Sequence, residues 1–223
     1  VDLVDPATGA LAWVSNDATS SPLVGPDGDV YIGVLESDAP NHNYRGWLLH
    51  FNAALTQTKT PGSFGWDNTP SVVPAAMLGT RYTGSSSYLV LTKYNNYIGT
   101  PTGDGRNKMA ILDPNATQAD PVKPGVAVMR EVTTVLGPTQ DPGRPAGAVR
   151  EWCVNTAVVD PATRSVLINN EDGRLYRWDL ANDRLSESLA MNAGVFQSYT
   201  PTAIGPDGSI YAINNAILHC VGQ

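Results

Sequence analysis

The chain contains the segment GPDGDVY at residues 25–31 and repeats it almost unchanged as GPDGSIY at residues 205–211. Each copy follows a proline and a short apolar run, and each leads into a run rich in β-branched and aromatic residues. An Asp-Gly pair between two such runs is typical of a β-hairpin, because glycine accepts the positive φ that a tight turn needs. The repeated segment is therefore predicted to form a β-hairpin.

Strand-like runs separated by turn signals fill the rest of the chain. Residues 1–14 predict the last two strands of one unit, and further units follow at about 20–58, 69–135, 155–189 and 200–221. Repeats of roughly 45 residues with four strands each are typical of β-propellers. We therefore expect an all-β fold, a β-propeller of four-stranded antiparallel blades with about four blades in this chain and no long amphipathic helix.

Several phrases resemble a known family. The segments DPATGALAW at 5–13, GDVYIG at 28–33 and DGRLYRWDL at 172–180 are similar to the blade repeats of quinoprotein-like (PQQ-repeat, YVTN-type) propellers. The segments RGWLLHF at 45–51 and REWCVNTA at 150–157 resemble parts of bacterial secreted propeller proteins without an assigned activity. The resemblance implies a ring of about six to eight blades, of which this chain would be a C-terminal portion. The alternatives are a second chain that completes the ring and a four-bladed ring closed by an N-terminal strand.

Charge and composition restrict the kinds of partner and the location that we expect for this protein. The chain has 21 acidic and 14 basic residues and a net charge of −7, without a basic stripe, which argues against a nucleic-acid partner. No apolar stretch approaches the roughly 20 residues of a membrane span. Few lysines and many Asn, Thr and Ser residues favour a secreted or periplasmic protein. Cys153 and Cys220 lack CxxC spacing and could form a disulfide, stay as thiols or bridge to another segment.

Long loops are expected on one face of the propeller. The connections at 37–45 and 95–107 follow the second strand of a blade, and those at 58–68, 136–150 and 191–199 join one blade to the next. Both kinds of connection lie on the same face, so that face is predicted to be functional. The long connection at 113–125 is expected on the opposite face.

Carboxylates lie beside aromatic residues just before the predicted inner strands, a combination that suits a polyol, a sugar or a cation. His42 could also act as a general base or a metal ligand. The candidate ligand-binding residues are Asp17, His42, Tyr44, Trp66, Asp67, Arg150, Glu151, Trp152 and Tyr199. The structural alternative is that the carboxylates accept backbone N–H bonds and the tryptophans pack between blades.

No catalytic or metal-binding motif is recognised in the sequence. No cofactor is predicted; the carboxylates could hold a calcium ion, whereas PQQ is not supported because the chain has no vicinal cysteine pair. We expect an extracellular module that binds a small molecule or carbohydrate, or a protein chain that completes the propeller. The alternative is part of a propeller enzyme, an oxidoreductase or a carbohydrate-active lyase or hydrolase, whose other site residues lie outside this chain.

Overall fold

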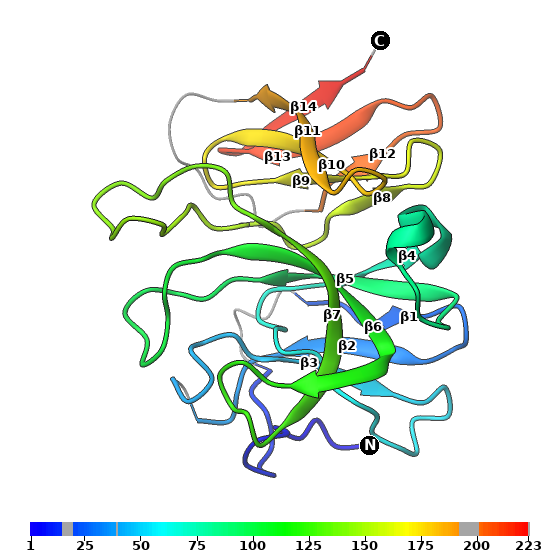
Figure 1. Ribbon diagram of the computed structural model, residues 1–223, viewed down its shortest axis with the longest axis vertical. Coiled ribbons are helices and arrows are strands. Elements are labelled where there is room, and N and C mark those ends of the chain that lie inside the picture. The colour runs from blue at the N-terminus through cyan, green and yellow to red at the C-terminus, as the bar shows by residue number, and fades with distance from the viewer. Residues whose placement is uncertain (15–19, 39, 192–200, 223) are drawn as a thin grey trace.

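The computed structural model describes residues 1–14, 20–38, 40–191 and 201–222. They form four antiparallel sheets in which neighbouring strands follow chain order, as in propeller blades (Figure 1). The first sheet contains β1 (Leu23–Val24), β2 (Val30–Val34) and β3 (Trp47–Phe51), and the second contains β4 (Ser71–Pro74), β5 (Tyr88–Tyr94), β6 (Lys108–Ala119) and β7 (Ala127–Leu136). The third contains β8 (Val158–Asp160), β9 (Ser165–Asn169), β10 (Arg174–Asp179) and β11 (Arg184–Ala190), and the fourth contains β12 (Ala203–Ile204), β13 (Ile210–Asn214) and β14 (Ile217–Val221). The predicted fold class, an all-β propeller of antiparallel blades, is confirmed, with three or four strands in each sheet of the described residues.

Both copies of the repeated segment form the predicted hairpin. Val24 pairs with Val30 in the first copy, and Ile204 pairs with Ile210 in the second. The turn glycines Gly28 and Gly208 have φ values of 87° and 83°, which only glycine adopts without strain. The hairpins thus place equivalent inner strands at the start of the first and last sheets.

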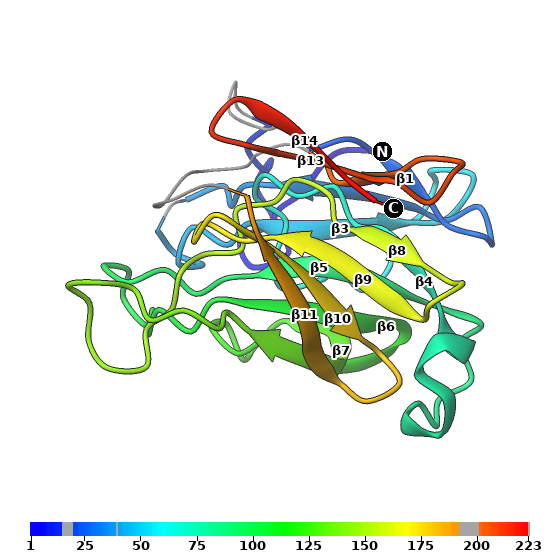
Figure 2. The same cartoon turned by 90° about the horizontal axis from the view of Figure 1, so that it is seen from above.

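The inner strands lie next to one another around the propeller axis. β8 contacts both β4 and β12, and Figure 2 shows β4 and β8 side by side. The backbone N–H of Thr69 donates to the carbonyl of Asn155 at 3.0 Å, and the N–H of Thr202 donates to the carbonyl of Thr156 at 3.0 Å. These bonds join successive blades just before their inner strands begin, and so fix the loops that precede those strands.

Two segments differ from the strand predictions. Residues 58–62 run beside β3 through two isolated bridges, Phe51 with Thr58 and Leu48 with Gly62, in place of a regular outer strand. Residues 1–14 form only the bridges Val4 with Leu11 and Trp13 with Leu35. A short 3-10 helix, η1 (Ala75–Arg81), was not predicted.

The connection expected as a loop at 113–125 is mostly strand. β6 continues to Ala119 because register shifts within its pairing with β7 absorb the turn-like residues after Asp113. The end of this hairpin covers the first sheet: the N–H of Met129 donates to the carbonyl of Pro61 at 2.7 Å, and Val128 packs in a cluster with Trp47 and Phe51. Figure 1 shows the green hairpin descending past β3.

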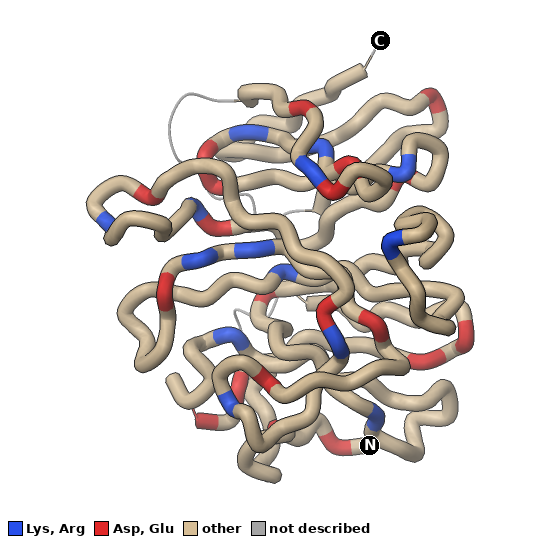
Figure 3. Tube along the Cα trace, viewed as in Figure 1, with Lys and Arg blue, Asp and Glu red and all other residues tan. Residues whose placement is uncertain are grey.

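Charge is distributed over the whole fold. Acidic and basic positions are interspersed along the trace in Figure 3, without a long run of one sign in the part of the chain that is described. No helix in the described ranges is long and apolar enough to cross a lipid bilayer. Cys153 is buried and Cys220 is exposed, and no disulfide joins them.

Candidate functional site

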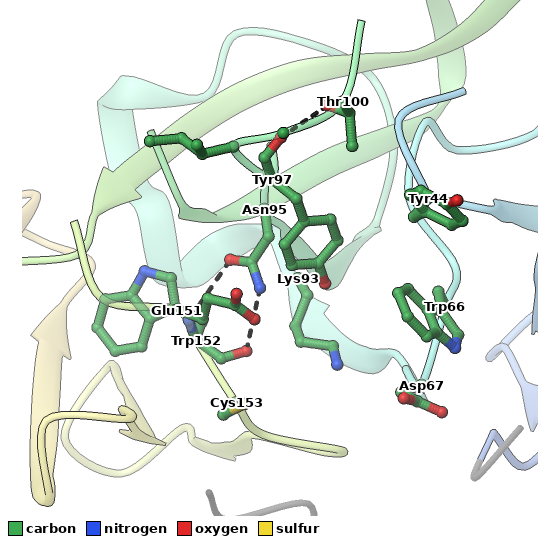
Figure 4. A pocket seen from close by; sticks show the side chains of 12 residues that line it. Tyr44, Trp66, Asp67, Lys93, Asn95, Tyr97, Thr100, Glu151, Trp152 and Cys153 are labelled. Atoms are coloured by element: carbon green, nitrogen blue, oxygen red, sulfur yellow. Dashed lines mark hydrogen bonds between the residues drawn. The ribbon is translucent and has the colours of Figure 1, made fainter. Parts of the chain in front are cut away.

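A pocket of about 420 Å³ opens where loops of the first, second and third sheets meet (Figure 4). Tyr44 follows β2 and residues 97–100 follow β5, whereas residues 66–67 precede β4 and residues 151–153 precede β8. The lining residues are Tyr44, Trp66, Asp67, Lys93, Asn95, Tyr97, Ile98, Gly99, Thr100, Glu151, Trp152 and Cys153. The pocket thus lies among the two kinds of loop expected to share the functional face.

Aromatic rings form one wall of the pocket. The rings of Tyr44 and Trp66 lie 6.2 Å apart between centroids, and Trp66 meets Tyr97 edge-on at 6.0 Å. The carbonyl of Arg45 accepts the N–H of Trp66 at 3.0 Å, which holds this wall against the loop after β2. The planes of these rings are inclined to one another, and a single ring face, such as that of Trp66, can pack against the C–H face of a ligand.

The loop that carries Tyr44 is held in place by the buried carboxylate of Glu36. The carboxylate of Glu36, 1% exposed, accepts the N–H of Tyr44 at 2.7 Å and the N–H of Gly46 at 2.8 Å. Gly46 has a φ of 62°, and a Cβ there would lie 1.9 Å from the carbonyl oxygen of Val34. Only glycine therefore allows the close approach that places Tyr44 and Trp66.

The opposite wall is held by two hydrogen bonds between the side-chain amide of Asn95 and the backbone of Trp152. The side chain of Asn95, 1% exposed, donates to the carbonyl of Trp152 and accepts the N–H of Trp152, both at 3.4 Å. The carbonyl of Glu151 accepts the N–H of Glu171 at 3.0 Å. These bonds hold residues 151–152 beside the end of β5.

Lys93 is a basic residue inside this pocket. It is 2% exposed, and its Nζ lies 5.8 Å from the centroid of the Phe64 ring. In Figure 4 the Lys93 side chain runs into the space between Trp66 and Asp67 on one side and Glu151 and Cys153 on the other. Burial lowers the pKa of Lys93, and the charges of Cys153, Asp67 and Glu151 oppose that shift.

Burial also disfavours the charged form of Glu151. Burial, reinforced by the nearby charge of Glu171, raises the pKa of Glu151 to about 7, against the attraction of Lys93. A carboxyl group with this pKa can donate and accept a proton near neutral pH. The pocket therefore combines an amine, a carboxyl group whose pKa is raised to about 7 and an aromatic wall.

The structure places the predicted site residues in three groups. Tyr44, Trp66, Asp67, Glu151 and Trp152 line the pocket. His42 and Arg150 do not line it. Asp17 and Tyr199 lie outside the described residues.

His42 and Arg150 have structural partners. His42 is 1% exposed and stacks on Trp47, with Nδ1 at 2.9 Å from the carbonyl oxygen of Gly46 and Nε2 at 3.1 Å from Asp120 Oδ1. The guanidinium Nη1 of Arg150 lies 3.2 Å from Asp141 Oδ1.

Lys93 was missed by the sequence reasoning. It lies in the run YLVLTKY at 88–94, every residue of which is buried. A lysine within such a continuous apolar run is the signal that could have identified it, because lysine is almost never fully buried without a partner. No group of three or more His, Cys, Asp or Glu side chains that could hold a metal is found among the described residues. The calcium ion considered from the sequence stays a prediction.

No family model and no curated protein matches this chain. The solved structures to which the chain is similar include two propellers. One is Sqt1 of Saccharomyces cerevisiae, with 12% identity, a TM-score of 0.47, and coverage of 84% of this chain and 40% of that one. The other is BamB of Moraxella catarrhalis, with 16% identity, a TM-score of 0.43, and coverage of 96% and 54%. The chain thus spans about half or less of each matched structure, and its fold is defined by its own four sheets.

Proposed function

We propose that the protein is an extracellular or periplasmic ligand-binding propeller module, and that its pocket holds a small polar molecule of the sugar or polyol type. One observation carries this proposal: Tyr44, Trp66, Asp67, Glu151 and Trp152, from loops far apart in the sequence, line one open pocket. A volume of about 420 Å³ lies within the range of small-molecule sites.

The lining matches the chemistry of such a ligand. The C–H face of a sugar can pack on the Trp66 ring, while its hydroxyl groups can donate to Asp67. The Nε1 of Trp66 is buried and has no acceptor among the described residues.

Calorimetric titration with a panel of monosaccharides and the corresponding sugar alcohols tests the proposal. We expect at least one member to bind, and Trp66→Ala to weaken its binding about tenfold or more. Asp67→Asn should also weaken binding without straining the backbone, because Asp67 has a φ of 49° and asparagine tolerates that conformation.

Trp13→Ala is the matched control, since Trp13 is 59% exposed and lies outside the pocket. This variant should bind like the unmodified protein. If no sugar or sugar alcohol binds, or if Trp13→Ala weakens binding as much as Trp66→Ala, the proposed function is wrong.

A further inference from the structure

We propose, resting on the ligand-binding function above, that Lys93 forms a reversible imine with the carbonyl group of the bound molecule. The ligand class is thereby narrowed to small hydroxylated aldehydes and ketones, such as sugars in their open-chain form. Lys93 then binds the ligand covalently through its Nζ, and Glu151 donates and accepts the proton. The aromatic wall contacts the rest of the ligand.

The position of the amine is the first support. Lys93 is 2% exposed, yet it lines the pocket, so the part of the side chain that remains accessible faces the ligand space. Removing an ammonium group from water is costly, and burial of Lys93 in the pocket therefore favours the neutral amine. The neutral amine is the nucleophilic form of lysine.

The charges around the amine favour a carbonyl over an anion. Asp67 and Glu151 line the same pocket, and Glu171 and Asp141 add negative charge near Glu151 while Arg144 opposes it. A carboxylate or phosphate ligand would be repelled by these groups. A carbonyl group carries no charge, so it can approach Lys93 between the two carboxyl groups.

The reaction is balanced without any further reagent. The Nζ lone pair attacks the carbonyl carbon, a C–N bond forms, and a proton moves from nitrogen to oxygen to give a carbinolamine. Protonation of the hydroxyl group by the Glu151 carboxyl expels water, and the nitrogen lone pair forms the C=N bond. The resulting iminium returns a proton to the Glu151 carboxylate, so amine and carbonyl give imine and water, and no group is oxidised or reduced.

The small number of lysines makes the test specific. The chain contains Lys59, Lys93, Lys108 and Lys123. The folded protein is incubated at pH 7 with glyceraldehyde and sodium cyanoborohydride, which reduces an imine to a stable secondary amine, and labelled peptides are quantified by mass spectrometry. We expect Lys93 to be labelled at least tenfold faster than each of the other lysines, although it is the most buried of them.

Variants distinguish imine formation at Lys93 from nonspecific labelling of lysine side chains. Lys93→Arg keeps a cation and Lys93→Met keeps the length of the side chain, and both should abolish the fast labelling. Lys123→Arg, outside the pocket, should leave it unchanged. Glu151→Gln should slow the labelling of Lys93 by about 10- to 100-fold, because it cannot transfer the proton.

The outcome distinguishes this inference from the proposed function, because sugar alcohols have no carbonyl group. If sugar alcohols bind in a Trp66-dependent way but Lys93 is labelled no faster than Lys59, Lys108 and Lys123, the imine is refuted and the binding function stands. If sugar alcohols do not bind but Lys93 alone is labelled fast, the imine stands and the ligand is not a polyol. If neither occurs, both are wrong.

Discussion

A buried amine and a buried carboxyl group share one pocket, and burial disfavours the charged form of each. Burial lowers the pKa of Lys93 and raises that of Glu151 to about 7, whereas their mutual attraction opposes both shifts. Such a pair costs stability and is usually kept for function rather than for folding. This balance makes Glu151 the residue whose replacement reports most clearly on the pocket.

Replacing Glu151 should make the protein more stable at high pH. In the unfolded chain the carboxyl ionises near its ordinary pKa of 4.5, whereas in the folded protein its pKa is about 7. The free energy of unfolding therefore falls as pH rises from about 4.5 to about 7, and the loss is complete above pH 7. We expect Glu151→Gln to raise the free energy of unfolding by about 1 to 3 kcal/mol at pH 8 and by much less at pH 4.5, as measured by urea denaturation.

Glu187→Gln is the control for this comparison, because the Glu187 side chain is 71% exposed. It should change stability by less than about 0.5 kcal/mol at either pH. An effect of Glu151→Gln that is the same at pH 4.5 and pH 8 would show that its carboxyl is not buried as described.

Four of the candidate residues line the pocket because each lies just before an inner strand. Trp66 and Asp67 precede β4, and Glu151 and Trp152 precede β8, so the topology alone brings them to one face. His42 looked reactive because it lies in a polar loop. Its burial depends on Asp120, which is 78 residues further along the chain, and no local pattern reveals that contact.

The loop after β2 illustrates how a structural element positions the site. It approaches β2 so closely that Gly46 leaves no room for a side chain. We expect Gly46→Ala to lower the free energy of unfolding by about 2 to 3 kcal/mol, because a methyl group would clash with the carbonyl of Val34. Urea denaturation measures this loss, and titration should show weaker ligand binding, since Tyr44 and Trp66 depend on the loop.

Gly143→Ala separates steric contact from backbone strain. Gly143 also has a positive φ, 76°, but nothing lies within 4 Å of the position that a Cβ would take. The Gly143→Ala variant should therefore lower the free energy of unfolding by only about 1 kcal/mol, because alanine is strained at a positive φ. Equal losses in the two variants would contradict the close approach of the loop.

The long β6–β7 hairpin is attached to the first sheet through Asp120. Burial alone would raise the pKa of Asp120, but hydrogen bonds from His42 and from the backbone N–H of Lys123 contribute to lowering it to about 2. A lowered pKa stabilises the fold above the ordinary value of 3.8, and this stabilisation is lost as pH falls towards 2.

We therefore expect Asp120→Asn to lower the free energy of unfolding by about 1 to 3 kcal/mol at pH 6 and by less near pH 2. Urea denaturation at both pH values measures the difference, with exposed Asp2→Asn as the control. A loss that does not shrink at low pH would assign the effect to packing rather than to the carboxylate.

Most central strands could be predicted from their β-branched runs, and the four sheets fall within the units predicted at 20–58, 69–135, 155–189 and 200–221, apart from the last residue of β7 and of β11. The extension of β6 could not, because Pro114 and Asn115 read as a turn. Bulges within the pairing accommodate them, and bulges depend on the partner strand rather than on local sequence.

At the scale of the whole molecule, the outer blades differ in how well they are covered. Leu3, Ala12 and Val128 pack against one face of the first sheet. On the fourth sheet, Ala212 and its neighbours pack against the third sheet, while Leu218 on the other face is 62% exposed. The fourth sheet is therefore attached through one face, as far as the described residues show.

This asymmetry predicts a gradient in local stability. We expect backbone amides of β13 and β14 to exchange with deuterium faster than those of β5 and β6, because β5 is buried throughout whereas β14 is mostly exposed. Native-state hydrogen exchange measures this order. Uniform protection of all four sheets would instead indicate that the chain unfolds as one cooperative unit.

The repeats predicted the four sheets because each blade is a local unit, with neighbouring strands joined by short turns. The pocket depends on three successive blades being placed around one axis. The sequence could therefore indicate which loops lie on the same face, but not that Lys93 would be directed into the pocket between them.

The most direct test of the whole account is protection of Lys93 from labelling. The protein is treated with glyceraldehyde and sodium cyanoborohydride in the presence of increasing concentrations of a sugar alcohol that binds it. We predict that labelling of Lys93 falls as the pocket fills, while labelling of Lys59 and Lys123 is unchanged. Fast labelling of Lys93 that the sugar alcohol does not reduce, or no preferential labelling of Lys93 at all, would contradict the claim that one pocket binds the ligand and presents the amine to it.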